Sequence, residues 1–285
     1  MNEKTKKRVI IGGGVCVAVI AAAIACGLYW HAEYQVPREN AEKAFVAAVN
    51  GLEERNAELD EAIESLQVLA SSGEEPLDET LLELASQRIG EAQGARQAAP
   101  EMPDDTAAIN EAAAHIDSLG DYSEALEALA STEATLANSI SQRKQVTNPP
   151  EQFVIERLAG LPGITGVEAV TEGNDPNGKL GKPGGYTATV YFSSDLIDQS
   201  TVYRTEGHTA IVGAGCSGGG AVEVYATEGD AIQRRDYLAL FDGGVLASGS
   251  HTVVGTCLVR TSDELTASQQ RALEESIIAS LTELR

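Results

Sequence analysis

The feature that most constrains this chain is an uncharged apolar stretch of 22 residues, VIIGGGVCVAVIAAAIACGLYW, at positions 9–30. As a helix it would be roughly 33 Å long, which exceeds the bilayer hydrocarbon core of about 30 Å. Basic residues dominate positions 1–8, and Tyr29 and Trp30 end the stretch, as is typical of the two interfaces of a membrane-spanning helix. The pattern predicts a cytoplasmic basic tail (1–8), a single-pass transmembrane anchor in the plasma membrane (9–30), and an extracytoplasmic remainder.

The end of the same stretch also allows a lipid anchor in place of a membrane-spanning helix. The sequence AIAC at positions 23–26 resembles a bacterial lipobox, in which Cys26 would become a lipidated N-terminus. A signal peptide cleaved after AAAIA is a further alternative, but the apolar stretch continues past that site. The transmembrane anchor and the lipid anchor both place the rest of the chain on the same side of the membrane.

The charge of the chain narrows the choice of partners. It carries 43 acidic and 20 basic residues, a net charge of −23, and this balance repels nucleic acid. Hydrophobic residues make up 43% of the 285 positions, which is enough for at least one packed core. We therefore expect a folded protein that contacts the membrane through residues 9–30 and binds no nucleic acid.

The motifs give no cofactor or metal site. The four cysteines form no C-x-x-C pair and no Cys/His cluster, which are the usual signs of a zinc site. Glu172, Asp175 and Asn177 lie in a loop rich in Gly, Pro and Asn and supply only part of an EF-hand pattern. His115 is interpreted as an exposed helix residue. We assign no catalytic residue, metal ligand or cofactor.

Residues 31–148 are predicted to form an antiparallel helical bundle, or stalk, with coiled-coil character. Its first helix carries residues spaced alternately four and three apart, which is a heptad seam: Phe45, Val49, Leu52, Asn56, Leu59, Ile63, Leu66 and Ala70. The polar member, Asn56, either fixes the register against a partner helix or lies wetted at the edge of the seam. Apolar stripes from about positions 78, 105 and 121 predict three further helices, and their short connections predict antiparallel neighbours.

Residues 149–285 are predicted to form an α+β domain, because the pair of prolines in TNPPE at 147–151 marks a boundary. Thr266 and Gln269 have the spacing of a capping box for a closing helix. The predicted helices are at 151–159, 228–241 and after Thr266, and the predicted strands at 164–170, 186–192, 210–213, 221–227 and 251–260, the last with a bulge at Gly255. This order predicts a sandwich in which helices pack on one face of a mainly antiparallel sheet.

A glycine-rich segment, residues 208–220, contains two spacings found in enzymes. One is the G-x-G-x-x-G of a dinucleotide-binding turn at 213–218, and the other is the G-x-S-x-G of a hydrolase nucleophile turn around Ser217. Both turns require a helix directly afterwards, whereas the following GGAVEVYAT favours a strand. We interpret the segment as a connection between two strands. The alternative is an enzyme that uses this segment to bind a flavin or nucleotide, or as a serine hydrolase with His208 or His251.

Cys216 and Cys257 are the two cysteines of the C-terminal domain. In an oxidising compartment paired cysteines are normally bridged, so we expect a disulfide that ties the glycine-rich segment to a central strand. The alternative is that Cys257 is a buried core residue.

Two regions resemble a known group of proteins. They are VEVYATEGDAIQRRDYLALFDG with SGSHTVVGTCLVRTSDELTASQQ near the C-terminus, and YQVPRENAEKAFVAAVNGLEERNAELDEAI after the apolar stretch. Both regions resemble membrane-anchored envelope proteins of Gram-positive bacteria, some of which carry an extracellular-matrix-binding label. The resemblance implies a location and a domain plan but no catalytic residues. We expect a non-catalytic binding, structural or assembly role, with a protein or a wall component as the partner of the C-terminal domain.

Overall fold

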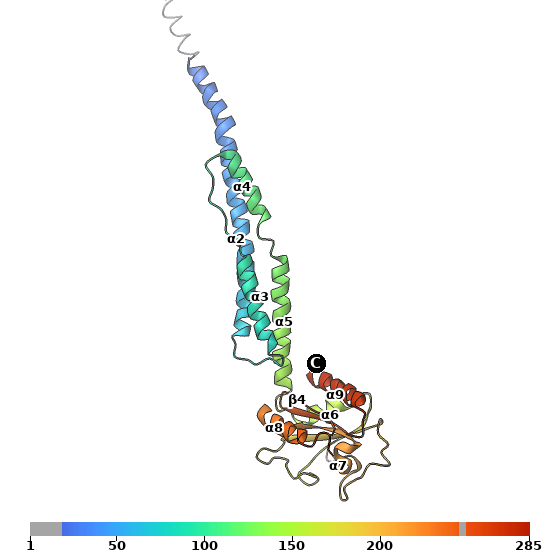
Figure 1. Ribbon diagram of the computed structural model, residues 1–285. Helices are drawn as coiled ribbons and strands as arrows, with labels where there is room; N and C mark the ends of the chain where they lie inside the picture. Colours follow the sequence, from blue (N-terminus) through green and yellow to red (C-terminus); the bar gives the residue numbers. More distant parts are fainter. Residues whose placement is uncertain (1–18, 245–248) are drawn as a thin grey trace, which may run out of the picture. The chain divides into compact units, whose positions relative to one another are not determined.

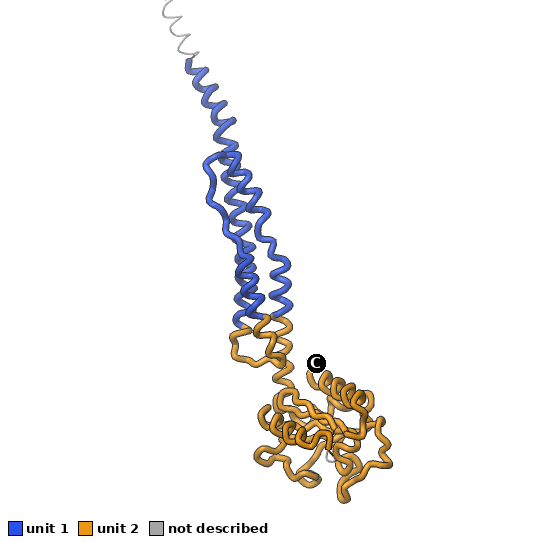
Figure 2. The backbone as a smooth tube through the Cα atoms, viewed as in Figure 1, with its two compact units in different colours: residues 1–68, 85–132 blue, residues 69–84, 133–285 orange. Residues whose placement is uncertain are grey.

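The computed structural model describes residues 19–244 and 249–285. Contacts divide the chain into two compact units, which Figure 2 shows in different colours, and Figure 1 labels the helices and strands. The first unit comprises Met1–Val68 with Ala85–Thr132, and the second comprises Leu69–Leu84 with Glu133–Arg285. The second unit therefore contains the complete α+β domain together with short segments of the bundle helices.

The chain is helical from residue 19 to residue 70. A π-helical turn, η1 (His31–Gln35), interrupts the α-helix, and α2 (Val36–Ala70) follows it. Every side chain from 19 to 40 is exposed. Among the residues that the structure describes, no helix is both long and apolar enough to span a bilayer. The predicted basic tail and residues 9–18 of the predicted anchor lie outside the described residues.

The predicted helical bundle is confirmed. It consists of α2, α3 (Thr80–Ala95), α4 (Thr106–Ser118) and α5 (Ser123–Gln145). In the first unit, α2 packs on α4 through a core of mostly small and aliphatic side chains, namely Ala41, Phe45, Ala48, Leu52, Ile109, Ala113 and Ile116. Asp105 caps α4, because its carboxylate accepts hydrogen bonds from the backbone N–H groups of Ala107 and Ala108.

Asn56 is buried, and both polar atoms of its side chain hydrogen-bond to other residues of this chain. It therefore neither lies wetted at the edge of the seam nor pairs with a partner helix, the two alternatives that the heptad spacing left open. Its Oδ1 accepts a hydrogen bond from the Tyr122 hydroxyl at 2.7 Å, and its Nδ2 donates to the Gln97 carbonyl at 2.9 Å. The backbone N–H of Gln97 in turn donates to the Tyr122 hydroxyl at 2.9 Å. The network fixes the extended segment after α3 and the start of α5 against the middle of α2.

The sheet of the second unit has five strands, all antiparallel to their neighbours, in the order β1-β2-β3-β5-β4. The strands are β1 (Ile164–Ala169), β2 (Ala188–Ser194), β3 (Gly219–Val224), β4 (His251–Val254) and β5 (Cys257–Thr261). The helices of this domain are α6 (Glu151–Leu158), α7 (Ala210–Ala214), α8 (Glu228–Ala239) and α9 (Ala267–Thr282), with a 3₁₀ turn, η2 (Gly215–Gly218). Thr266 and Gln269 form the predicted capping box of α9. The expected antiparallel α+β domain is thus confirmed.

Helices cover both faces of the sheet, so the prediction that they pack on one face is wrong. The apolar face carries Val190, Val222, Val259 and their neighbours, and it packs against α6 and α9. The opposite face packs against α8, α7 and η2. This second face also carries large side chains, such as Tyr191 and Leu258, and they require a cover of their own.

Two strand predictions need correction. The segment 210–213 is the helix α7, because the Thr209 hydroxyl caps it by accepting from the N–H of Val212. The segment 251–260 is a hairpin, and Gly255, with φ +57°, belongs to its two-residue turn rather than to a bulge. A Cβ at Gly255 would lie 2.6 Å from the Val146 carbonyl oxygen, so only glycine allows the turn to approach the end of α5 this closely.

Candidate functional site

The glycine-rich segment 208–220 forms no phosphate-binding or nucleophile turn. It runs through α7 and η2 directly into β3, so the helix that both motifs require is absent from this described segment. Its last glycines are required by packing, since a Cβ at Gly219 would lie 2.5 Å from the Phe192 carbonyl oxygen and one at Gly220 would overlap the carbonyl of Arg260. The segment lies between β2 and β3, and it contains a short helix and a 3₁₀ turn.

The residues of the hydrolase alternative do not form a triad. Ser217 is exposed, and its carbonyl accepts a hydrogen bond from the Ser262 hydroxyl at 3.1 Å. His251 lies 3.5 Å from Asp242. In the described part of the chain, neither His208 nor His251 hydrogen-bonds to Ser217, so the arrangement lacks the nucleophile–base contact of hydrolysis.

The predicted disulfide is wrong, because Cys216 and Cys257 are both free. Cys257 lies in the core on the apolar face of the sheet, whereas Cys216 packs beside Tyr191 and Ala221 on the opposite face. Burial raises the pKa of the Cys257 thiol to about 12 and also raises that of Cys216. The alternative for Cys257, a buried core residue, is confirmed. Cys26 is an exposed thiol on the helix of residues 19–30.

Asp175 organises its own loop. Its carboxylate accepts hydrogen bonds from the backbone N–H groups of Asn177, Lys179 and Leu180, and from the hydroxyl of Tyr186. Burial opposes ionisation, but these donors together lower the pKa of Asp175. Among the residues described, no cluster of three or more His, Cys, Asp or Glu side chains is placed to hold a metal ion.

A buried ionic cluster occupies the second face of the sheet. The Glu223 carboxylate contacts the guanidinium of Arg260 at 2.6 Å and that of Arg234 at 3.3 Å, and it accepts from the Tyr225 hydroxyl at 2.7 Å. Burial alone would raise the pKa of Glu223, but the two guanidinium groups lower it below its ordinary value. Because Glu223 is 0% exposed and Arg260 only 6% exposed, we interpret this cluster as a link between β3, β5 and α8.

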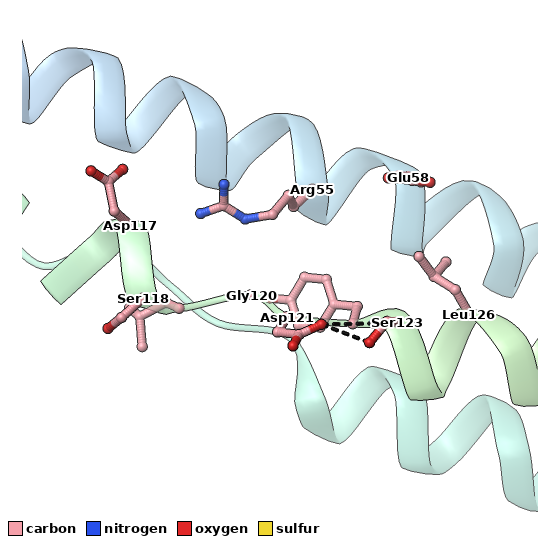
Figure 3. A pocket seen from close by; sticks show the side chains of 10 residues that line it. Arg55, Glu58, Asp117, Ser118, Gly120, Asp121, Ser123 and Leu126 are labelled. Atoms are coloured by element: carbon pink, nitrogen blue, oxygen red, sulfur yellow. Dashed lines mark hydrogen bonds between the residues drawn. The ribbon is translucent and has the colours of Figure 1, made fainter. Parts of the chain in front are cut away.

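A candidate ligand site lies in the first unit, where α4 ends and α5 begins (Figure 3). This pocket, which we call the bundle pocket, has a volume of about 360 Å³. It is lined by Arg55, Glu58, Asp117, Ser118, Leu119, Gly120, Asp121, Tyr122, Ser123 and Leu126. Gly120 shapes it, because its φ of +74° lets the connection press against α2.

The charged side chains of the bundle pocket differ in how many hydrogen bonds they make. Asp121 accepts hydrogen bonds from the N–H and the hydroxyl of Ser123, at 3.2 and 2.8 Å. The Arg55 guanidinium donates only to the Ile116 carbonyl, at 3.3 Å, and its buried Nε has no hydrogen-bond partner within the described residues. The sequence did not predict this site, since the position of Arg55 on α2 gives no sign that the connection between α4 and α5 lies opposite it.

The chain matches no protein-family model, no curated protein and no solved structure. The class of the protein therefore rests on its structure: a helical bundle followed by an α+β domain with a five-stranded antiparallel sheet.

Proposed function

We propose that this chain is a membrane-anchored cell-envelope protein whose bundle and α+β domain lie outside the cytoplasm and have a non-catalytic binding or assembly role. The observation that carries the proposal is the exposed apolar helix that precedes the bundle. Seven large side chains on it are between 53% and 64% exposed, namely Val19, Ile20, Ile24, Leu28, Tyr29, Trp30 and Tyr34. Full burial of each aliphatic member would contribute up to about 1.5–3 kcal/mol, which a lipid bilayer would supply.

The sequence around this helix supports the same assignment. The uncharged run continues back to residue 9, and basic residues precede it, which favours a cytoplasmic N-terminus. The resemblance to envelope proteins of Gram-positive bacteria agrees with this location. The net charge of −23 argues against nucleic acid as the partner.

The single tryptophan of the chain, Trp30, provides a direct test. The purified full chain is reconstituted into phosphatidylcholine/phosphatidylglycerol vesicles, and Trp30 fluorescence is recorded with brominated lipids as quenchers. The proposal predicts a blue-shifted emission that brominated acyl chains quench. Emission that stays typical of a water-exposed indole, with no quenching by the lipids, would refute the anchor.

A matched control places the tryptophan on the α+β domain. In the variant Trp30→Phe with Tyr237→Trp, the new indole takes the place of a ring that is 52% exposed on α8, and its emission should not respond to brominated lipids. The alternative anchor through Cys26 is separated by mass spectrometry of the protein from the host membrane, because a lipidated chain would begin at Cys26 and would carry acyl chains.

A further inference from the structure

The bundle pocket contains a guanidinium group that lacks a counter-ion. In the same unit Arg38, Arg88 and Arg96 each pair with a carboxylate, at 2.8, 2.7 and 3.2 Å. Arg55 has no ion pair within residues 19–244 and 249–285, although three carboxylates line the same pocket. A guanidinium has five N–H donors, and on the partly buried Arg55 only one of them is used, in the hydrogen bond to the Ile116 carbonyl. The pocket therefore presents unused donors to whatever enters it.

The connection between α4 and α5 determines where the Arg55 side chain lies. The connection between α4 and α5 presses on α2 at Gly120, where an added Cβ would lie 2.8 Å from Leu52 Cδ1 and 3.1 Å from Arg55 Nε. Arg55 Nε is buried beside this connection, and one terminal nitrogen donates a hydrogen bond to the Ile116 carbonyl. The rest of the guanidinium faces the pocket, with Asp117 across the gap from it (Figure 3).

The carboxylates of the pocket lie at its rim. Asp117 and Glu58 are exposed, and in the described part of the chain neither one hydrogen-bonds or forms an ion pair. The pocket thus combines one free positive group inside with free negative groups at its mouth. A simple anion would satisfy Arg55 but would be repelled by the rim and by the net charge of −23. A simple cation would leave Arg55 unpaired.

We propose that the bundle pocket binds a small zwitterion with the chemistry of a free α-amino acid. The ligand carboxylate pairs with the Arg55 guanidinium, whose planar fork suits bidentate contact. The ligand ammonium group pairs with Asp117 at the rim. A zwitterion has no net charge, so the acidic chain does not repel it, and the volume of about 360 Å³ is within the range of small-molecule sites.

The proposal is tested by titrating the full-length protein with the twenty common amino acids, followed by calorimetry or ligand-observed NMR. At least one amino acid should bind saturably. Its N-acetyl derivative, which lacks the ammonium group, and its amide, which lacks the carboxylate, should each bind about tenfold or more weakly. If no amino acid binds saturably, or if both derivatives bind as well as the parent, the proposal is overturned.

Variants identify the site. Arg55→Gln and Asp117→Asn should each weaken binding by about tenfold or more, whereas Arg88→Gln, which removes an exposed guanidinium from α3, should bind like the wild type. Circular dichroism checks that the variants are folded. If Arg55→Gln does not fold, Arg55→Lys replaces it, because this variant keeps the positive charge but loses the bidentate fork. Wild-type affinity in all folded variants of Arg55 and Asp117 would contradict the assignment. The inference does not depend on the anchor, whose own test uses Trp30.

Discussion

Replacement of Glu223 by glutamine should strongly destabilise the α+β domain. Glu223 is 0% exposed and is the only carboxylate that contacts the guanidinium groups of Arg260 and Arg234 among the described residues. Breaking a buried ion pair by removing one partner typically costs about 3–5 kcal/mol, because the other charge is left uncompensated. At about 2–4 °C per kcal/mol, the melting temperature of this domain should fall by about 6–20 °C.

The assay is thermal unfolding followed by circular dichroism at neutral pH. The control is Glu172→Gln, which removes a carboxylate from an exposed loop position and should change stability by less than about 0.5 kcal/mol. In the double variant Glu223→Leu with Arg260→Met, much of the loss should be recovered, since no buried charge of that pair is left alone. A Glu223→Gln protein that melts like the control would refute the view that the domain depends on this cluster.

The pH dependence gives the same prediction a second readout. The pKa of Glu223 is lowered in the folded protein, so its contribution is full above the unfolded value of about 4.3 and is lost as the pH falls through the lowered pKa. The difference in melting temperature between wild type and Glu223→Gln should therefore be constant near neutrality and should shrink below about pH 4. A difference that grows in acid would contradict the sign.

Three other outcomes are expected. Gly255→Ala should lower the melting temperature because its Cβ would lie 2.6 Å from the Val146 carbonyl oxygen, whereas Gly178→Ala, at a similar φ of +61° with open space around it, should have a smaller effect. Tyr122→Phe removes the hydroxyl between Asn56 and Gln97 and should cost about 1–3 kcal/mol in urea unfolding, while Tyr203→Phe at an exposed position should not. Thiol titration of a denatured, unreduced Cys16→Ser/Cys26→Ser variant should find two free thiols, and a value of zero would restore the disulfide.

The bundle was predictable because its signal is local. The heptad spacing identified the buried side of α2, including Leu52, Leu59 and Leu66. The partners of Asn56 were not predictable, since Gln97 and Tyr122 lie far along the chain. For the same reason Arg55 could not be assigned to a pocket that the α4–α5 connection creates.

In the α+β domain, alternation predicted which residues share a face but not what covers that face. In β3, Val222 and Val224 face the core of α6 and α9, and Glu223 between them faces the opposite side, as strand alternation requires. The second layer of helices made Glu223 a buried residue, and its two arginine partners come from α8 and β5. The disulfide prediction failed for a related reason. An oxidising compartment favours a disulfide, but Cys216 and Cys257 pack on opposite faces of the sheet.

The most direct test of the central claim is the topology of the chain in living cells. Single cysteines are introduced at Asn2 in the basic tail and at Glu172 in an exposed loop of the α+β domain, with Cys16, Cys26 and Cys216 replaced by serine. A membrane-impermeant maleimide is then applied to intact cells of a Gram-positive host. The account predicts that Glu172→Cys is labelled on intact cells and Asn2→Cys only after lysis. Labelling of Glu172→Cys only after lysis would contradict it.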